Sequence, residues 1–448
     1  MKKLSVGFCI RDQEYSEVIS SYLNKIDLTD IDITFISEEH VDTEFKNLSI
    51  NNYLNKEENK NIELDPKIWK NENVYKADPR YINKKGNINR EFQNSYTEAC
   101  RQIFSTYKFD LLFSGSAGRL IWTVPHLVAL EKSVLAYKLV PSDYLNPRFE
   151  GIRFWFCTDI FWDIDLNSEF DFEWSEVEIE TQIENLQKSL LSENFNLASR
   201  ALLSRENYTP KKLLNIIKNI IKIILQNDYL SKLRIKSFIN SIRNKKFYTP
   251  PEELKREFIL YPLNQPHDEQ LLVRAPKYLD TVENIKLIAN NLPKNINLVV
   301  KEHPVNPGMI SNKEIKKIKK EYKNIFFVNP SLHIRPLIVK SLGLITINST
   351  AGIEALICNK KIIVLGESYY KHNTMAYKPK NENELRHCLQ DLINNNEFTP
   401  ESTRNMLKQL LNQSFPSPNE YPSKQGDANL VVGAAIKHKI EQVKSVLI

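Results

Sequence analysis

Apolar and polar residues alternate along the chain in two separate stretches, and each stretch predicts strands that are followed by helices. Short apolar runs have the length of buried strands, and the segments between them repeat apolar residues at helical spacing. Strands that alternate with helices are typical of parallel βαβ units. In the first stretch the predicted strands span residues 4–10, 31–36, 109–113 and 133–139, and the predicted helices span residues 14–23, 91–107 and 119–131.

Two parts of the first half depart from this alternation. Residues 38–90 are polar and rich in Asn, Lys and Glu, so we expect a long irregular insertion there. Residues 174–247 predict helices, and within them a stripe of apolar residues recurs at helical spacing. The stripe consists of Leu213, Leu214, Ile217, Ile220, Ile221 and Ile224. The sequence Thr249-Pro250-Pro251 ends this segment and predicts a linker between domains.

The alternation restarts after residue 251 and is more regular there. The predicted strands span residues 257–261, 296–300, 325–328, 343–347 and 361–365, and predicted helices span residues 279–290, 312–322 and 334–340. A turn at residues 348–352 opens a further predicted helix that runs to residue 357. Residues 382–448 predict a helical tail with a polar break near 414–427.

This pattern predicts an α/β fold of two Rossmann-like, doubly wound domains that face a cleft. A helical insertion precedes the second domain and a helical tail follows it. We expect an N-terminal domain at residues 1–250, including the helical segment, and a C-terminal domain at residues 251–448. Ligands of such sheets bind beyond the carboxyl ends of the strands.

Composition agrees with this picture. A chain of 448 residues is too long for one ordinary core. It has no run of eighteen apolar residues, so we expect no transmembrane helix. Its apolar start is short, and Arg11, Asp12 and Glu14 follow at once, which favours a first strand and a cytoplasmic protein over a signal peptide. The five cysteines are scattered without a C-x-x-C pair, which argues against a disulfide framework and against a zinc site.

The positive charge is concentrated in the helical segment. Residues 208–247 contain ten Lys or Arg and a single acid, Asp228. Such a surface could meet nucleic acid, an anionic membrane or an acidic polymer. The segment has no nucleic-acid-binding motif and few aromatics to stack bases, so we expect no nucleic-acid partner. The Lys-flanked stripe could rest on an anionic membrane, or it could pack on the protein's own core.

Three polar clusters in the second half follow predicted strands. The first comprises Asn348, Ser349, Thr350, Gly352 and Glu354, where a strand ends and a helix begins. Ser349 and Thr350 could cap the helix and help to hold an anion, the glycine would let a phosphate or another backbone approach, and Glu354 could hold ribose hydroxyls. An ordinary capped helix start remains the alternative.

The second cluster is Lys301-Glu302-His303-Pro304. A histidine beyond a strand end could bind a phosphate as an imidazole cation or protonate a leaving oxygen. The third cluster spans residues 261–270, in which Asp268 and Glu269 could act as base or nucleophile or could only cap the next helix. Gln265 could hydrogen-bond a base or a sugar.

In the first half, residues 114–118 form a turn with two glycines, but the Lys-Ser/Thr of a P-loop is missing. Arg119, Arg148 and Arg153 could bind an anionic acceptor or the carboxylate of a donor. Solvated or structural arginines are an equal alternative.

The three C-terminal clusters, taken together, resemble the capsule polysaccharide biosynthesis family, which includes the bacterial Kdo transferases. The resemblance runs from about residue 258 to residue 370, where residues 362–366 and Tyr369-Tyr370 follow the clusters. It is weaker over residues 110–159, through Pro141-Ser142 and Gly151-Ile152-Arg153.

The resemblance implies a GT-B glycosyltransferase that uses a CMP-activated ulosonic acid such as CMP-Kdo without a metal or another cofactor. In this family likeness His303, Ser349 and Thr350 would hold the CMP phosphate, and Glu354 would lie near the ribose. Lys301, Asn348, Gly352 and Gln265 would belong to the same donor site. Asp268 would be the catalytic carboxylate, with Glu302 as second candidate. The acceptor end of the family is variable, so Arg119 and Arg153 are candidates for binding the acceptor or a carboxylate from their residue type alone. The expected partners are a nucleotide-sugar donor, a glycan or lipid-linked glycan acceptor, and an anionic membrane surface through residues 208–247.

Three other functions remain open at this point. A CDP-glycerol or CDP-ribitol phosphotransferase of the teichoic-acid kind also uses a histidine near a strand end and Ser/Thr at a helix start. A UDP-sugar epimerase has the same overall shape. A non-catalytic protein that binds a nucleotide or glycan belongs to a different class.

Overall fold

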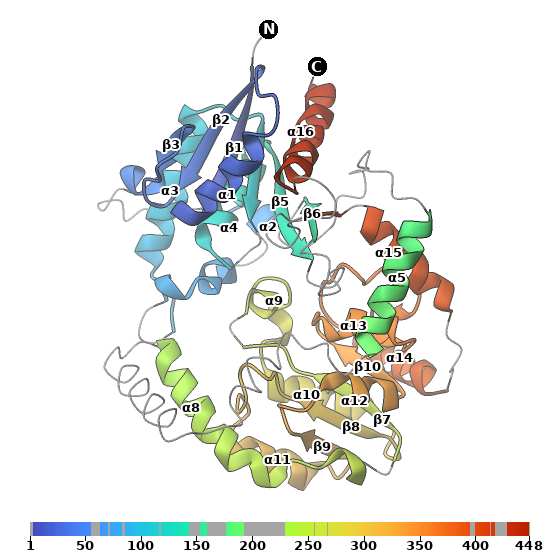
Figure 1. The fold of residues 1–448 in the computed structure, drawn as a ribbon. Helices are drawn as coiled ribbons and strands as arrows, with labels where there is room; N and C mark the ends of the chain where they lie inside the picture. Colours follow the sequence, from blue (N-terminus) through green and yellow to red (C-terminus); the bar gives the residue numbers. More distant parts are fainter. Residues whose placement is uncertain are drawn as a thin grey trace, which may run out of the picture. The chain divides into compact units, whose positions relative to one another are not determined.

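The computed structural model describes residues 3–54, 63–69, 72–82, 86–115, 118–142, 153–158, 176–191, 229–254, 256–266, 268–394, 399–412, 414–416 and 428–447 (Figure 1). The chain divides into two compact units. The first contains Met1–Tyr81, Ile88–Gln182 and Lys408–Ile448, and the second contains Ile82–Asn87 and Ile183–Leu407.

The first unit is built on a sheet with the strand order β13-β6-β5-β4-β1-β2-β3 among the described residues. Strands β1 to β5 pair in parallel, whereas β6 and β13 are antiparallel additions at one edge. Numbered along the sheet, β3-β2-β1-β4-β5 is the order of a Rossmann fold, which reverses between β1 and β4. The strands are β1 (Leu4–Ile10), β2 (Ile31–Ser37), β3 (Lys46–Ser49), β4 (Leu111–Gly115), β5 (Leu135–Ser142), β6 (Arg153–Cys157) and β13 (Phe415–Pro416).

Three longer helices of this unit were predicted in position. They are α1 (Gln13–Leu23), α3 (Arg90–Thr106) and α4 (Leu120–Glu131). The expected insertion also contains a strand, β3, together with η1 (Ile50–Tyr53), α2 (Pro66–Trp69), η2 (Glu72–Ala77) and η3 (Pro79–Tyr81). Strand β3 escapes a sequence-based prediction because only half of its four residues are buried, which leaves no apolar run.

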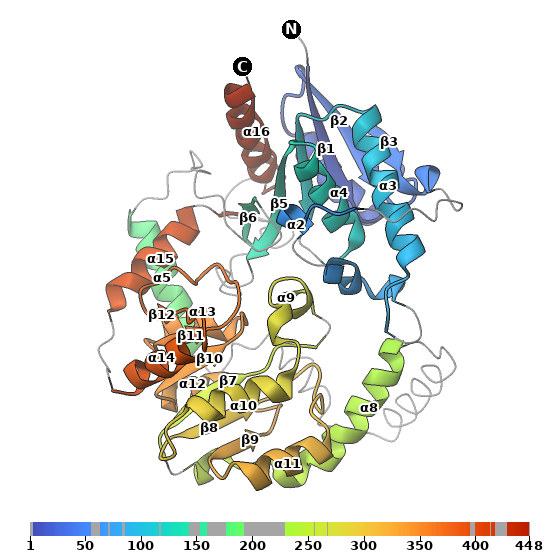
Figure 2. The same cartoon turned by 180° about the vertical axis from the view of Figure 1, so that it is seen from behind.

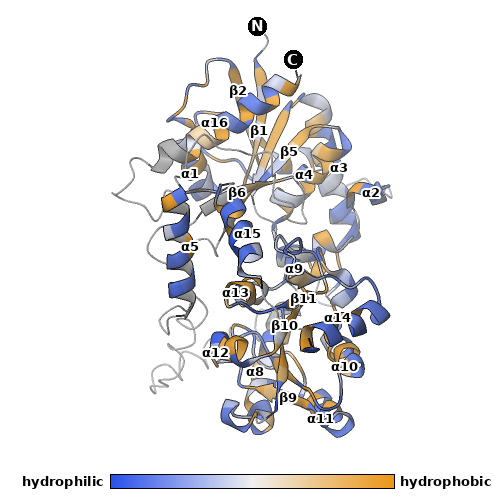
Figure 3. Ribbon diagram, turned by 90° about the vertical axis from the view of Figure 1, so that its right-hand side faces the viewer, coloured by the Kyte–Doolittle hydropathy of each residue, from blue (hydrophilic) through white to orange (hydrophobic). Residues whose placement is uncertain are grey.

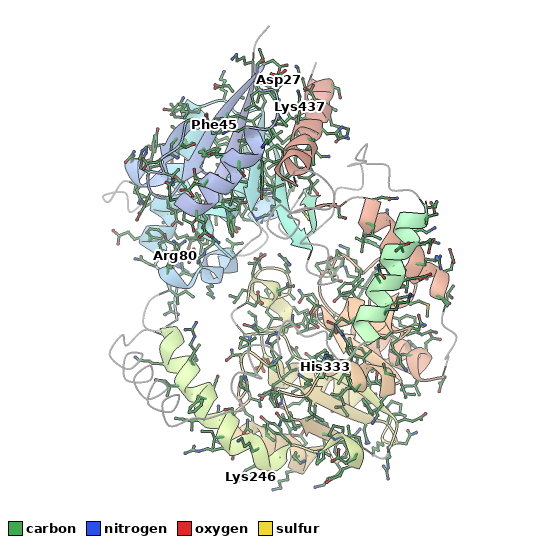
Figure 4. The ribbon with its side chains drawn as sticks, viewed as in Figure 1. Asp27, Phe45, Arg80, Lys246, His333 and Lys437 are labelled. Atoms are coloured by element: carbon green, nitrogen blue, oxygen red, sulfur yellow. The ribbon has the colours of Figure 1, made fainter. Side chains whose placement is uncertain are left out.

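The C-terminal helix α16 (Ala428–Leu447) packs on the first unit, not on the second as predicted. Its apolar side chains Val432, Ile436 and Ile440 are part of the core formed by β1, β2 and α1. Lys437 of α16 lies 4.0 Å from the carboxylate of Asp27, and Figure 4 shows these two residues side by side. Because burial of this apolar face stabilises the unit on which it packs, α16 is part of the N-terminal fold.

The second unit contains a sheet with the order β12-β11-β10-β7-β8-β9 among the described residues, and all of its strand pairs are parallel. This is again the Rossmann order, and it reverses between β7 and β10. The strands are β7 (Phe258–Pro262), β8 (Asn297–Lys301), β9 (Ile325–Val328), β10 (Gly343–Thr346), β11 (Ile362–Val364) and β12 (Ala376–Tyr377). Figure 2 shows this sheet from behind, with α10 and α14 lying over the strands.

The helices of this part of the chain follow the predicted alternation. They are α8 (Tyr229–Asn244), α9 (Glu269–Leu272), α10 (Thr281–Asn291), α11 (Asn312–Glu321), α12 (Ile334–Lys340), α13 (Ala351–Ile357) and α14 (Glu382–Asn394), with the short turns η4 (Lys245–Phe247), η5 (Pro251–Glu253) and η6 (Pro276–Tyr278). The boundaries between the two units fall within two further helices, α5 (Glu176–Leu191) and α15 (Pro400–Asn412).

The strands of this sheet are buried on both faces, which explains why they appear in the sequence as continuous apolar runs. Ile288 of α10, Ile315 of α11 and Leu389 of α14 complete the core. Figure 3 shows the resulting distribution, with hydrophobic residues concentrated in the strands and hydrophilic residues on the outer faces of the helices.

The predicted boundary at residue 250 differs from the observed division. Helix α8 belongs to the second unit, and the backbone N–H of Thr249 donates to the carbonyl of Phe327 in β9 over 2.7 Å. Tyr248 forms a parallel bridge with the same residue. Thr249-Pro250-Pro251 therefore continues beside the edge of the sheet instead of linking two domains. The predicted stripe from Leu213 to Ile224 lies outside the described residues.

Both units are Rossmann-like and doubly wound, as predicted. That they face a cleft stays a prediction.

Candidate functional site

The polar clusters of the second half meet at one edge of the second sheet. Strands β10, β7 and β8 are neighbours and run in parallel, so their carboxyl ends lie together where the strand order reverses. Asn264, beyond β7, donates its side-chain amide to the side-chain oxygen of Asn348, beyond β10, over 2.8 Å. Asn348 in turn donates to the carbonyl of Gln270 over 2.7 Å. Both asparagines are buried, so this chain of bonds fixes the two loops against each other.

Asn264 was not singled out in the sequence. The signal was present, because an asparagine two residues beyond a buried strand resembles Asn348 after β10. Asn348 itself acts here as the partner of another loop, and its predicted role in donor binding stays a prediction.

The turn between β10 and α13 is held by Thr346. Its hydroxyl accepts the backbone N–H of Ser349 over 2.9 Å and lies 2.9 Å from the Ser349 hydroxyl. Thr350 occupies the N-cap position, but its side chain forms no capping bond. The prediction that the two hydroxyls cap the helix is therefore wrong. The Thr350 side chain is exposed and that of Ser349 is half-buried, so both remain near the sheet edge.

In the structure, the side chain of Tyr370 occupies the space beside Gly352. A Cβ atom at this position would lie 2.5 Å from the hydroxyl of Tyr370 and 2.6 Å from two of its ring carbons. The Tyr370 hydroxyl also donates to the carbonyl of Ser349 over 2.5 Å. The glycine thus makes room for a buried tyrosine that supports the turn, and its predicted role in donor binding stays a prediction.

Glu302 anchors the loop after β8. Its two carboxylate oxygens accept the backbone N–H groups of Gly308 and Ile310, each over 2.9 Å, and the Tyr248 hydroxyl donates over 3.3 Å. The pKa of Glu302 is raised overall, because the effect of burial exceeds that of these hydrogen bonds, which lower it. A carboxylate whose oxygens are both engaged by the loop backbone is poorly suited to serve as a base. These contacts favour an anchoring role for Glu302, and its catalytic role stays a prediction.

His303 is held as a neutral hydrogen-bond donor. Its Nδ1 accepts the backbone N–H of Val305 over 3.2 Å, so the proton of the neutral ring lies on Nε2. Burial lowers the pKa of His303 to about 4, and the positive charge of Lys301 adds to this effect. The expected imidazole cation is therefore absent near neutral pH in the unliganded protein. An anion bound beside the ring would raise its pKa again.

Lys301 and Glu354 lie in a buried group of charges. Lys301 donates to the carbonyl of Pro330 over 2.8 Å, and burial lowers its pKa to about 8. The Glu354 carboxylate lies 3.7 Å from Nε of Arg335 in α12. Burial raises the pKa of Glu354, against the charges of Arg335 and Lys301. Arg335 was missed in the sequence because its partner is nineteen positions away on another helix, and contacts of this kind are not periodic.

Asp268 caps α9. Its Oδ1 accepts the backbone N–H of Gln270 over 3.2 Å, which confirms the capping alternative. Burial raises the pKa of Asp268, and the charge of Glu269 adds to this. Glu269 is itself paired with Arg274 over 2.6 Å. A half-buried acid with a raised pKa still suits proton transfer, so a catalytic role for Asp268 stays a prediction. The carbonyl of Gln265 accepts the Asp268 N–H over 3.4 Å, and its donor-binding role is likewise untested.

The first unit has its own polar edge where β1 and β4 end. Arg119 is half-buried immediately before α4. Arg11 follows β1, pairs with Asp12 over 2.5 Å and lies 5.7 Å from the Trp122 ring. Burial raises the pKa of Asp12, but bonds from Arg11 and Tyr15 and the charges of Arg11 and Arg119 lower it overall. The side chain of Arg153 and the whole of Arg148 lie outside the described residues.

A network of ion pairs between an exposed arginine and two buried acids was missed in the insertion of the first half. Arg80 bonds both oxygens of Glu38 over 2.8 and 3.0 Å and pairs with Asp78 over 2.5 Å (Figure 4). Asp78 also accepts the backbone N–H of Leu120, the first residue of α4, over 3.2 Å. The insertion is thereby fastened over the ends of β2 and β4. Its polar composition suggested an irregular loop, whereas several of its charges are structural.

Two candidate features can be checked across the described residues. These residues contain no cluster of three or more His, Cys, Asp or Glu side chains that could hold a metal ion. No helix within them combines the length and the apolar character needed to cross a membrane.

Residues 200–410 match the family model described as capsule polysaccharide biosynthesis protein. Capsule polysaccharide modification protein LipB of Neisseria meningitidis serogroup B is 32% identical over 123 residues, which are 25% of this chain and 29% of that protein. Capsule polysaccharide export protein KpsS of Escherichia coli is 32% identical over 134 residues, which are 28% of this chain and 34% of that protein. The alignments thus span about a third of the length of these relatives.

Matches among the solved structures include Thermosulfurimonas dismutans KpsC, beta Kdo 2,7 transferase. It is 12% identical, with coverage of 98% of this chain and 100% of that chain and a TM-score of 0.41. UDP-GlcNAc 2-epimerase of Neisseria meningitidis is also 12% identical, with coverage of 99% and 100% and a TM-score of 0.27. Likenesses this weak do not assign a function.

Proposed function

This chain belongs to the capsule polysaccharide biosynthesis family through residues 200–410, and from that membership we propose that it is a glycosyltransferase of the GT-B class. It transfers an ulosonic acid such as Kdo, or a related nonulosonic acid, from a CMP-activated donor. The acceptor is a glycan or a lipid-linked glycan in the synthesis of a surface polysaccharide. The matched region contains every residue of the second unit that we assign to the donor site.

One observation carries the proposal. A neutral imidazole with its proton on Nε2, from the loop after β8, and two hydroxyls, from the turn after β10, lie beyond the carboxyl ends of strands that flank β7 in one sheet. That edge is the reversal point at which Rossmann sheets bind nucleotides. An uncharged donor that is already held by a hydrogen bond to the backbone, as His303 is, needs little reorganisation when negative charge appears on a phosphate.

The reaction follows from these groups. The acceptor hydroxyl forms a bond to the anomeric carbon of the donor sugar, and the bond between that carbon and the phosphate oxygen breaks. The electron pair leaves with CMP, whose phosphate receives hydrogen bonds from His303 Nε2 and the Ser349 and Thr350 hydroxyls. Asp268 takes the acceptor proton. A single donor of this kind contributes about 2.7–4 kcal/mol to stabilisation of the transition state.

The remaining assignments complete the proposal. Glu354 lies near the ribose, Lys301 contributes its charge to the donor site, and Arg119 and Arg153 bind a carboxylate of the acceptor or donor. The reaction proceeds without a metal ion, because the leaving phosphate meets hydrogen-bond donors. The protein acts in the cytoplasm at the inner face of the cell membrane, where lipid-linked acceptors are found.

The test is a thermal-shift screen of the full chain with CMP, CDP, UDP and GDP, followed by mass analysis of the product. A ligand that binds the folded state raises the unfolding midpoint. We expect CMP to raise it most, and the acceptor to gain the mass of a sugar. A gain of phosphorus would identify a CDP-polyol phosphotransferase, and a shift by UDP with epimerisation of a UDP-sugar would identify an epimerase. Binding of a nucleotide without turnover would indicate a non-catalytic binding protein.

A further inference from the structure

Helix α8 presents two chemically different faces. Its inner face is polar and is fastened to the loop that carries His303. The side-chain amide of Asn240 donates to the carbonyl of Gly308 over 3.1 Å, and that of Asn244 donates to the carbonyl of Ile310 over 2.9 Å. Both asparagines are buried. Gly308 has a φ of +80°, and a Cβ atom there would lie 2.0 Å from the carbonyl of Ser237, so helix and loop are in close contact.

The opposite face of α8 carries an outward apolar stripe. Ile235, Phe238, Ile239 and Ile242 have the spacing i, i+3, i+4 and i+7, which places them on one side of a helix. The exposed fractions are 41% for Phe238, 42% for Ile239 and 53% for Ile242. A surface helix normally turns such a stripe toward the core. Large apolar side chains that gather on an exposed face mark an interaction surface.

Cations border this outward stripe. Between residues 229 and 247 the chain carries six Lys or Arg and no acid, namely Lys232, Arg234, Lys236, Arg243, Lys245 and Lys246. At 100° per residue, Arg234 lies on one side of the stripe and Lys232, Lys236 and Arg243 lie on the other. Lys246 is found just beyond the end of α8 in Figure 4. The stripe is therefore an apolar strip with one cation of the helix on one side and three on the other.

We propose that the outward face of α8 docks on an anionic lipid surface. Phe238, Ile239 and Ile242 enter the boundary between headgroups and acyl chains, and the cations that border them lie against the headgroup phosphates. An amphipathic helix with aromatic and aliphatic residues on one side and Lys/Arg beside them has the chemistry for this position. A second copy of the chain fits the stripe less well, because it would bring two sets of six cations together.

This inference adds a surface and a partner to the proposed function. Docking through α8 does not depend on the transferase chemistry. If both hold, the bonds from Asn240 and Asn244 keep the His303 loop on a helix that rests on the membrane. The donor site would then be held near lipid-linked acceptors.

The test is co-sedimentation of the full chain with vesicles of phosphatidylglycerol and phosphatidylcholine, and with vesicles of phosphatidylcholine alone. The double variant Phe238→Asp/Ile242→Asp places two negative charges in the stripe. The matched control is Val177→Asp/Val446→Asp, because these valines are 75% and 79% exposed in other helices. Circular dichroism melts test whether both variants fold. Turnover measured in detergent, without vesicles, tests whether the active site is intact independently of membrane binding.

We expect binding to the anionic vesicles, a decrease of about tenfold or more in the Phe238/Ile242 variant, and no comparable decrease in the control. Turnover without vesicles stays at the wild-type rate. Failure of the wild-type chain to bind anionic vesicles would overturn the proposal, as would equal binding to neutral ones. Undiminished binding of the stripe variant, or conversion of a wild-type dimer to a monomer by that variant, would also overturn it.

Discussion

Asn264 and Asn348 share a hydrogen bond of 2.8 Å that joins the loops after β7 and β10. The bond lies at the point where the strand order of the second sheet reverses. The side-chain amide of Asn348 also donates a hydrogen bond to the carbonyl of Gln270. The edge of the sheet at which we place the donor is therefore organised before any ligand arrives. Pre-organisation of this kind reduces the cost of ordering the site on binding.

The first prediction concerns this bond. Asn348→Ala leaves the buried Asn264 amide without its partner, so we expect a loss of about 1–3 kcal/mol in the free energy of unfolding and weaker CMP binding. Urea denaturation and calorimetric titration measure the two effects. Asn405→Ala, on the exposed face of α15, is the control and should stay within about 0.5 kcal/mol of wild type. Equal stability of the two variants would contradict the proposed role.

The second prediction separates packing from ligand binding at Gly352. Because a methyl group there would overlap the Tyr370 ring, Gly352→Ala should lower the free energy of unfolding by about 1–3 kcal/mol. In a Tyr370→Leu background the same methyl should cost less, since the atoms that it meets are gone. A double-mutant cycle by urea denaturation measures the coupling. Additive effects would show that the tyrosine is not the reason for the glycine.

The third prediction tests Glu302 as an anchor. Glutamine has one oxygen where the carboxylate has two, so Glu302→Gln leaves the N–H of Gly308 or Ile310 unpaired and should cost about 1–3 kcal/mol in stability. Tyr248→Phe removes the longest of the three bonds and should cost less. A catalytic base would show the opposite result, with turnover lost and the urea midpoint unchanged.

The fourth prediction concerns the decrease in the free energy of unfolding at acid pH that His303 causes. The folded-state pKa of His303 is about 4, below its ordinary value of 6.5, so the unfolded chain binds more protons between these values. The contribution of His303 to stability is complete above pH 6.5 and is lost as the pH falls toward 4. We expect His303→Gln to reduce the decrease in the urea midpoint between pH 6.5 and 4. His387→Gln, at an exposed position of α14, should leave that decrease unchanged.

The sequence predicted the two alternating sheets because strands such as β7 and β8 are buried on both faces and appear as apolar runs between amphipathic helices. It also located the loops of the candidate site, since each follows such a strand. It did not show that α16 packs on the first unit or that α8 belongs to the second. Those placements depend on partners far away in the chain, such as Asp27 for Lys437 and Ile310 for Asn244.

The same limit applies within the site. Residue type suggested a catalytic Glu302, a phosphate-facing Gly352 and a capping Ser349, but it did not show what these residues contact. In the structure they contact Ile310, Tyr370 and Thr346, and only the folded chain brings these partners together. His303 lies beyond the end of β8, as predicted, but its protonation state depends on burial and on the Lys301 charge, which the spacing of residues does not reveal.

The most direct measurement of the central claim is kcat/KM for transfer from a CMP-activated ulosonic acid by three single variants at residues 303 and 387. We expect His303→Ala to lose about 10²–10³-fold, because the donor to the leaving phosphate is gone. His303→Gln should retain part of the rate, since its amide reaches the position of Nε2, and His387→Ala should match wild type. Transfer by His303→Ala at the wild-type rate, in a folded protein, would contradict the account.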